Sequence, residues 1–248
     1  MHAGGAIATV APRRNHAAMS PAARWGGGGR TAAGARAAPV PVVTGIMGPM
    51  PDPTAPIADR PAHPGIVPSP WIARFAHLIA EGSRVLDLAA GEGRHARFFA
   101  ARGCAVLAVD RDAAALAAVA DLPRVETRPL DLETGHWPLP GERFDAIVVV
   151  NYLHRPLFPH LFAALAADGV LLYETFARGN EAYGRPSRPD FLLEPDELLR
   201  LVAGRLAVVA FEQGHVAGAE RGAVVQRIAA VGPGRAWPQP LLPAPPGG

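Results

Sequence analysis

The chain has 248 residues, of which 49% are hydrophobic and 19% are charged. This composition allows one α/β domain with a sizeable core and argues against a chain that is disordered throughout. The net charge is +2, but residues 1–66 hold six arginines and two acids, so residues 67–248 are mildly acidic. A nucleic-acid-binding domain is therefore not favoured, because the part with a foldable pattern lacks a basic surplus.

The cysteine count and the short motifs exclude several other classes. Cys104 is the only cysteine, so no intramolecular disulfide can form, which fits a cytoplasmic protein. The sequence lacks Cys-x-x-Cys and His-Glu-x-x-His, so we expect no metal site. Its apolar runs are shorter than the roughly 18 residues that cross a membrane, so we expect no membrane association.

Composition divides the chain into three segments. Residues 1–66 are rich in Ala, Gly, Pro and Arg without a regular period, and we expect them to be disordered. Residues 67–231 carry the pattern of a folded domain, and residues 232–248 are expected to be a Pro-rich flexible tail. The lack of pattern before Met47 and Met50 leads to the hypothesis that translation begins at one of these methionines.

Apolar periodicity predicts alternating helices and strands from residue 71 onward. Glycine and proline then mark a long loop over residues 177–193. Strands that alternate with helices pair in parallel, whereas the last two predicted strands, joined by a short connection, pair antiparallel. We predict an α/β fold with a seven-stranded, mostly parallel sheet, one antiparallel edge strand and helices on both faces. The predicted helices are 71–79, 94–102, 112–119, 157–167 and 194–202, and the predicted strands are 84–90, 105–109, 125–130, 144–150, 169–174, 206–212 and 223–231.

A glycine-containing turn follows the first predicted strand, in the run Val85-Leu-Asp-Leu-Ala-Ala-Gly-Glu-Gly93. Asp87 ends the strand, and Ala89, Gly91 and Gly93 form the turn into the next helix. Such a turn lets the backbone approach a ligand, and the helix N-terminus offers free N–H groups. A tight strand-to-helix turn without a ligand is the alternative interpretation.

Two further acids follow the second and third strands. Asp110 ends the second strand, where a carboxylate can accept hydrogen bonds from both ribose hydroxyls. Asp131, with Leu132, follows the third strand. An Asp at this place commonly accepts a hydrogen bond from the amino group of an adenine. The alternatives are an N-cap for the helix from Asp112 and an ordinary loop acid. Because strand ends of a parallel sheet share one edge, we expect the three acids to form one site.

These residues resemble the cofactor motifs of class I S-adenosylmethionine (SAM) dependent methyltransferases, over about residues 67–231. The run Asp87-Leu-Ala-Ala-Gly-Glu-Gly-Arg-His-Ala96 is most similar to small bacterial tellurite-resistance-type methyltransferases. The resemblance implies a Rossmann-like fold and SAM as cofactor. It implies that Asp110, Asp131 and Leu132 lie at the nucleoside. The methionine side would be shaped by Asp87, Ala89, Gly91 and Gly93, and Asn151 would lie near the methyl group.

Candidate substrate residues follow the fourth and fifth strands. Tyr152 is a candidate wall for the methyl group, and His154 is a candidate general base at neutral pH. In the loop after the fifth strand, Tyr183, Arg185 and Arg188 are candidates for substrate binding. The two arginines suggest an anionic substrate, and a solvated loop is the alternative.

The sequence therefore predicts transfer of a methyl group from SAM to an unidentified acceptor, with a small molecule favoured. RNA and protein acceptors stay open. An NAD-dependent oxidoreductase is disfavoured because the first turn lacks Gly-x-Gly-x-x-Gly. A non-catalytic SAM-binding regulatory module stays open, because its cofactor residues would be the same.

Overall fold

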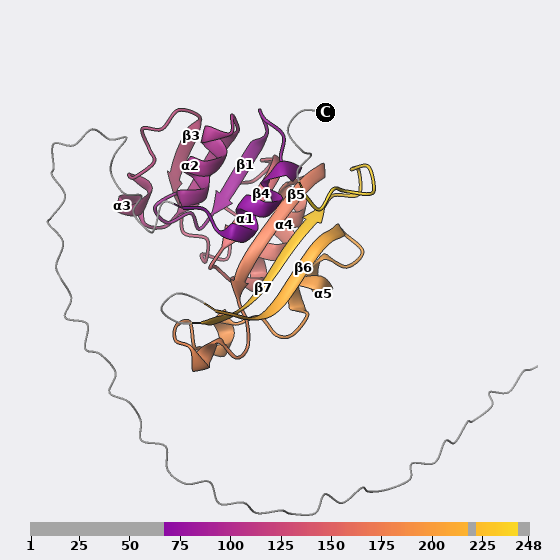
Figure 1. Cartoon of the computed structure of the whole chain (residues 1–248). Coiled ribbons are helices and arrows are strands. Elements are labelled where there is room, and N and C mark those ends of the chain that lie inside the picture. Colours follow the sequence, from indigo (N-terminus) through magenta and orange to yellow (C-terminus); the bar gives the residue numbers. More distant parts are fainter. Residues whose placement is uncertain (1–66, 218–221, 243–248) are drawn as a thin grey trace, which may run out of the picture. The chain divides into compact units, whose positions relative to one another are not determined.

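In the computed structural model, which describes residues 67–217 and 222–242, seven strands form a single sheet with helices on both faces (Figure 1). The expected disordered segment 1–66 and the end of the expected tail, 243–248, lie outside the described residues. The strands are β1 (Arg84–Leu88), β2 (Ala105–Asp110), β3 (Val125–Pro129), β4 (Phe144–Val150), β5 (Leu165–Phe176), β6 (Ala207–Val216) and β7 (Ala223–Val231).

The helices are short, and most of them connect one strand to the next along the chain. The α-helices are α1 (Pro70–Phe75), α2 (Arg94–Ala101), α3 (Ala113–Leu116), α4 (Phe158–Ala164) and α5 (Glu197–Val202). The 3-10 helices are η2 (Ala76–Leu78), η3 (Arg155–Leu157), η4 (Asn180–Ala182) and η5 (Pro189–Phe191). Within the described ranges, no helix has the length and apolar character that crossing a membrane requires.

The strand order is β3-β2-β1-β4-β5-β7-β6. The first five strands are parallel, and β7 runs antiparallel to both β5 and β6. The predicted mostly parallel sheet is confirmed, and its antiparallel strand, β7, lies one position in from the edge. The order reverses between β1 and β4, which places a crevice beyond their carboxyl ends.

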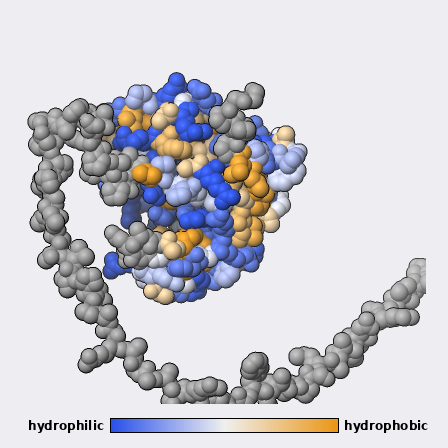
Figure 2. Space-filling view, viewed as in Figure 1, coloured by the Kyte–Doolittle hydropathy of each residue, from blue (hydrophilic) through white to orange (hydrophobic). Residues whose placement is uncertain are grey.

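Alternation of side chains along the strands gives the sheet two apolar faces. One face packs against α1, α2 and α3 through Phe75, Phe99 and Leu116. The opposite face packs against α4 and α5 through Phe158 and Leu198. Figure 1 views the sheet from the side of α1 and α2, and Figure 2 shows mainly hydrophilic residues on the outer surface of this side. The sheet is therefore the middle layer of three.

Several boundaries differ from the sequence prediction. The helix predicted over 157–167 ends at Ala164, because Leu165 pairs with Phe144 and begins β5. The helix predicted over 112–119 contains only Ala113–Leu116, and that predicted over 194–202 begins at Glu197. Strand pairing thus overrides the weak helical preference at the end of α4.

Part of the expected flexible tail contacts the domain. The Gly232 amide donates to the Gly169 carbonyl at 2.8 Å, and the Gly234 amide donates to the Ala167 carbonyl at 2.8 Å. The Arg235 guanidinium also donates to the Leu78 carbonyl at 2.5 Å. Residues 232–235 are therefore held against the end of the sheet.

Truncation of Phe99 tests the packing of α2, and its neighbour Phe98 provides a matched control. Phe99 is 0% exposed, whereas Phe98 is only partly buried. We expect Phe99→Ala to lower the free energy of unfolding by about 3–5 kcal/mol, because it leaves a cavity between α2 and the sheet. Phe98→Ala should cost clearly less. Urea unfolding of both variants measures this, and equal losses would contradict the packing described.

Candidate active site

The loop between β1 and α2 has an unusual backbone conformation. Ala89 and Gly93 have φ angles of 56° and 69°, in the left-handed region. An alanine there is strained, whereas glycine adopts it freely. A Cβ atom on Gly93 would also lie 2.5 Å from the Val119 Cγ2 atom. Glycine at 93 is therefore required by both the backbone angle and the close approach of Val119.

Asp87 holds this loop from beneath. Its side chain is 1% exposed, and its Oδ2 atom accepts a hydrogen bond from the Ala96 amide at 2.8 Å. The bond joins the end of β1 to the first turn of α2, where backbone amides lack helical partners. Burial raises the pKa of the Asp87 carboxyl from 3.8 to about 7, and the Ala96 hydrogen bond opposes this. Asp87 is thus a buried anchor that carries a proton for part of the time at neutral pH.

His95 lies beside Asp87 and is also buried. Its Nδ1 atom is 4.0 Å from the Asp87 Oδ1 atom, and its Nε2 atom accepts the Ser69 amide at 3.2 Å. Burial, followed by the charge of Arg94, lowers the pKa of His95 to about 3. The imidazole is therefore neutral and connects α2 to the residue that caps α1.

Asp110 links β2 to the same loop. Its Oδ2 atom accepts a hydrogen bond from the Gly91 amide at 2.8 Å, and its Oδ1 atom accepts one from the Asp112 amide at 3.0 Å. The N-cap of α3 is Asp112, which accepts from the Ala114 and Ala115 amides. Asp110 is therefore a loop anchor at the strand end rather than the helix cap.

Asp131 and Leu132 follow β3 as the sequence suggested. The Asp131 Oδ1 atom accepts a hydrogen bond from the Glu133 amide at 2.9 Å. Leu132 is 6% exposed and packs in the core, yet it also borders a cavity at the strand ends. The side chain of Asp131 is exposed at the same cavity, with its second oxygen available.

Two adjoining cavities lie beyond the carboxyl ends of the parallel strands. The larger has a volume of about 430 Å³, the smaller has a volume of about 280 Å³, and both are lined by Ala89 and Asn151. The smaller cavity is bordered by the loop from Ala89 to Glu92, by Arg94 and His95, and by Val150. The larger is lined further by Asp110, Arg111, Leu130, Asp131, Leu132, Glu133, Tyr152, Leu153, Thr175, Pro186 and Phe191.

The structure thus brings most of the predicted cofactor residues together. Ala89, Gly91, Asp110, Asp131, Leu132 and Asn151 line one or both cavities. Asp87 and Gly93 do not line them, because Asp87 lies beneath the loop and Gly93 faces Val119. These two residues shape the site through the backbone.

The two predicted catalytic residues lie in different places. Tyr152 lines the larger cavity, where its hydroxyl donates to the Glu133 Oε1 atom at 3.4 Å. Burial and the Glu133 carboxylate raise the pKa of Tyr152, so its phenol stays protonated at neutral pH. His154 precedes η3 and is not among the lining residues. Its placement gives no support to a role as general base.

The predicted substrate arginines lie outside the cavities. Arg188 pairs with Asp190 at 3.0 Å and has a side chain 72% exposed. Arg185 is exposed, and the Tyr183 ring stacks on His215 with a centroid distance of 4.6 Å. The same loop lines the cavity through Pro186 and Phe191 instead. The loop therefore reaches the cavity, and its lining residues differ from those expected.

Sequence reasoning missed several lining residues. Thr175 could have been found, because it lies one residue before the end of β5 and the same strand-end rule applies. Arg111 and Glu133 directly follow predicted residues. Leu130, Leu153, Pro186 and Phe191 carried no chemical signal in the sequence.

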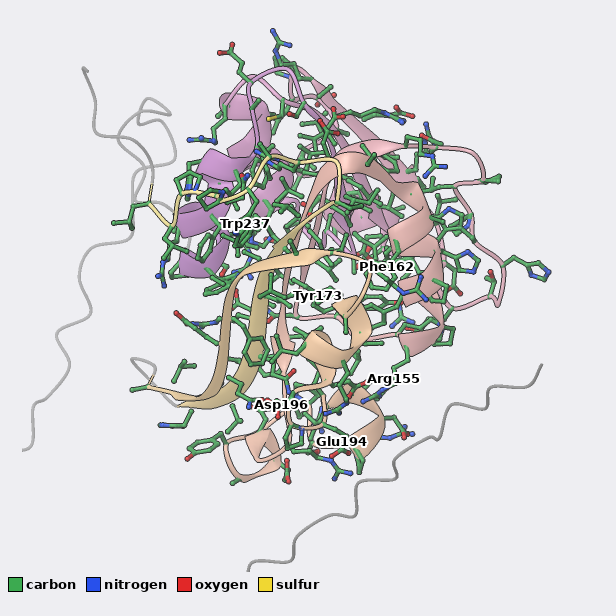
Figure 3. The ribbon with its side chains drawn as sticks, turned by 90° about the vertical axis from the view of Figure 1, so that its right-hand side faces the viewer. Arg155, Phe162, Tyr173, Glu194, Asp196 and Trp237 are labelled. Atoms are coloured by element: carbon green, nitrogen blue, oxygen red, sulfur yellow. The ribbon has the colours of Figure 1, made fainter. Side chains whose placement is uncertain are left out.

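The loop over residues 177–193 is fixed by Arg155. The Arg155 guanidinium donates to the carbonyls of Asp190 and Leu192 at 2.8 and 2.9 Å. It also forms a two-point ion pair with Glu197 at 2.7 and 2.9 Å. Figure 3 labels Arg155 on the same side of the molecule as Glu194, which pairs with Arg178. Arg155 thus fixes the backbone on both sides of Phe191, which lines the cavity.

The described residues of this site do not form a set of metal ligands. Among the described residues, no three His, Cys, Asp or Glu side chains gather in a way that would hold a metal ion. The polar side chains at the larger cavity are three carboxylates, one arginine, one amide and two hydroxyls. Such a set can bind the hydroxyl and amino groups of a nucleoside.

The raised pKa of Asp87 predicts a specific dependence of stability on pH. Because the carboxyl has a pKa of about 7 in the folded chain and 3.8 as its ordinary value in an unfolded chain, folding favours its protonated form. This contribution is complete below pH 3.8 and is lost as the pH rises toward 7. We expect the free energy of unfolding of Asp87→Asn, relative to wild type, to rise by on the order of 3–4 kcal/mol over this interval.

Urea unfolding at a series of pH values measures this difference. Asparagine keeps the side-chain oxygen that accepts the Ala96 amide, so the comparison isolates ionisation. The contribution of His95 has the opposite sign and is present in both proteins, so it cancels in the difference. Curves that run parallel across the interval would show that Asp87 ionises normally.

The comparisons with known proteins agree with this geometry. Residues 85–169 match the family model described as a methyltransferase domain, which spans β1 to the first part of β5. No curated protein matches the chain. The resemblance to class I enzymes therefore rests on the domain match, the fold and the residues of the site.

Solved structures share the fold. TehB from Haemophilus influenzae is 17% identical with a TM-score of 0.56, and the match covers 65% of this chain and 61% of TehB. This chain therefore spans about three fifths of the TehB chain. A SAM-dependent methyltransferase from Mesorhizobium loti is 20% identical with a TM-score of 0.52, and the match covers 65% of this chain and 96% of that protein.

A third structure, 1,6-didemethyltoxoflavin-N1-methyltransferase from Burkholderia thailandensis, is 23% identical with a TM-score of 0.50. The match covers 64% of this chain and 75% of that protein, which contains bound 1,6-didemethyltoxoflavin and S-adenosylhomocysteine. Together, these likenesses identify the fold. Residues 85–169 match the methyltransferase domain, and the described part of the chain shares its fold with TehB.

Proposed function

We propose that the chain transfers the methyl group of SAM to a small-molecule acceptor, with residues 67–231 as the catalytic domain. The observation that carries this proposal is the pair of adjoining cavities, which share Ala89 and Asn151 at the reversal point of the sheet. A molecule that extends along both would pass directly over the β1–α2 loop. The Burkholderia methyltransferase, which has a small molecule bound, supports an acceptor of this size class.

The nucleoside would occupy the larger cavity, beside β2 and β3. Each Asp110 oxygen accepts one backbone amide, and a carboxylate oxygen has a further lone pair for a ribose hydroxyl. The free oxygen of Asp131 would accept the adenine amino group, and Leu132 would contact the base. These residues therefore fit the hydrogen-bond donors of an adenosine group.

The methionine part would occupy the smaller cavity. The loop from Ala89 to Glu92 and the guanidinium of Arg94 border it, and both suit the carboxylate of an amino acid. Bound SAM would supply an electrophilic methyl group near Asn151, where the two cavities meet. The protein's task is then to orient the acceptor for in-line approach.

The residues that would act on the acceptor are Tyr152 and its neighbours. Tyr152 stays protonated, so it would serve as a wall and hydrogen-bond donor rather than as a base. We do not assign His154 a catalytic role, because it does not line the cavities. A cytoplasmic location remains our proposal, supported by the single cysteine, which forms no intramolecular disulfide.

Replacement of Asp110 tests the cofactor site. We expect the wild type to bind SAM and Asp110→Ala to bind it about 1–3 kcal/mol more weakly, because hydrogen bonds to a charged group are lost. Asp112→Ala is the matched control, since Asp112 caps α3 and does not line the cavities. Calorimetric titration of the three proteins measures the affinities, and thermal unfolding checks that each is folded.

Two outcomes would contradict the proposal. A wild type that does not bind SAM would end it, and equal losses for Asp110→Ala and Asp112→Ala would remove the assigned site. Formation of S-adenosylhomocysteine in the presence of cell extract distinguishes an enzyme from a non-catalytic SAM-binding module. A fluorescence titration with NADH tests the oxidoreductase alternative, for which we expect no binding.

A further inference from the structure

The larger cavity has two chemically different halves. The half beside β2 and β3 carries charged side chains, namely those of Asp110, Arg111, Asp131 and Glu133. The half beside β4 and β5 is lined by six uncharged side chains, those of Asn151, Tyr152, Leu153, Thr175, Pro186 and Phe191. Because the proposed function places the nucleoside in the first half, the second half is where the acceptor would lie.

The outer wall of the acceptor half offers flat apolar surface. Phe191 is 42% exposed although it lines the cavity, so its ring has area to bury against a ligand. The Arg188 guanidinium lies 5.3 Å from the centroid of this ring. Pro186 and Leu153 add further apolar surface. A flat aromatic molecule matches such a wall, because stacked rings gain both apolar burial and favourable geometry.

The arginines of the loop, Arg178, Arg185 and Arg188, do not line the acceptor half, although the Arg188 guanidinium lies against the Phe191 ring. Arg188 pairs with Asp190, and Arg155 and Arg178 pair with Glu197 and Glu194. An anionic acceptor among the six uncharged side chains would therefore lose water without gaining a charged partner, which is costly. The lining residues therefore favour an uncharged acceptor over the anionic one that Arg185 and Arg188 suggest in the sequence.

A carboxylate lies at the border between the two halves. Glu133 accepts a hydrogen bond from the Tyr152 hydroxyl at 3.4 Å. Its negative charge opposes an anion and favours positive charge that develops nearby. Tyr152, the only one of the six lining side chains with an ionisable group, stays protonated and cannot remove a proton from the acceptor. A nucleophile that needs no deprotonation suits this arrangement.

We infer, on the basis of the proposed function, that the acceptor is an uncharged, flat heteroaromatic molecule that is methylated on a ring nitrogen. The nitrogen lone pair forms the new N–CH₃ bond as the S–CH₃ bond breaks, and the electron pair of that bond stays on sulfur. The positive charge moves from sulfur to the product, S-adenosylhomocysteine leaves as a neutral thioether, and no proton is transferred. Glu133 then faces the charge that appears on the product.

The charge of the product tests this inference. The purified full chain is incubated with SAM labelled in its methyl group and an ultrafiltrate of extract from the cells that make the protein. Labelled products are separated by electrophoresis at strongly alkaline pH, and a reaction without extract marks unreacted SAM. We expect an extract-dependent small product that migrates as a cation, because a methylated ring nitrogen without a proton keeps its charge.

Each other outcome has a defined meaning. A labelled product that migrates as an anion or as a neutral molecule overturns the inference, and so does label in protein or RNA when whole extract is used. Protein that binds SAM by calorimetry but labels nothing in the extract also counts against it. Failure to bind SAM would instead refute the proposed function itself.

Two variants test the wall without knowledge of the acceptor's identity. With the labelled fraction as substrate, Phe191→Ala should raise KM by about tenfold or more, because a buried aromatic contact is lost. Its affinity for SAM should be unchanged. Arg185→Ala should leave both quantities at the wild-type level. A KM that rises with Arg185→Ala, or that does not change with Phe191→Ala, would contradict the proposed acceptor.

Discussion

The site depends on the hydrogen bond between the buried Asp87 carboxylate and the Ala96 amide. This bond joins the end of β1 to the first turn of α2 at 2.8 Å, and the left-handed loop between them must close over it. A carboxylate is costly to bury, which is why the pKa of Asp87 rises to about 7. The cost is tolerated because the bond fixes the loop that borders both cavities. An apolar residue at 87 would pack equally well but would leave the Ala96 amide without its partner.

Asp110 extends the same constraint to the neighbouring strand. Through the Gly91 amide, it connects the end of β2 to the middle of the loop that Asp87 holds from beneath. One carboxylate thus orders the loop and presents free lone pairs at the cavity. Its orientation is set before any ligand arrives, which lowers the ordering cost of binding. This double role separates Asp110 from Asp112, whose Oδ1 atom accepts two amides of the first turn of α3.

The site residues at the ends of the strands could be predicted from the sequence, whereas those in the loops could not. Asp110 and Asp131, which line the same cavity, could be placed together from sequence because a parallel sheet brings strand ends to one edge and strong apolar runs mark the strands. The loop over residues 177–193 follows no such rule, and polar residues alone suggested its role. Arg185 and Arg188 face solvent, while Pro186 and Phe191 line the cavity. Similarly, the early end of α4 depends on the pairing of Phe144 with Leu165, a contact between distant residues that local propensity does not encode.

Arg155 shows why the acceptor wall is a fixed surface rather than a lid. Arg155 follows Tyr152 by three positions. One short segment therefore supplies both a side chain that lines the cavity and the guanidinium that holds the loop over residues 177–193. Two carbonyls of the loop and both oxygens of Glu197 use its planar donors, a geometry that lysine cannot reproduce. Arg155 thereby ties the segment after β4 to the loop that carries Phe191. A wall that is ordered in advance selects by shape, and a flat uncharged acceptor is what such a wall can recognise without a charged partner.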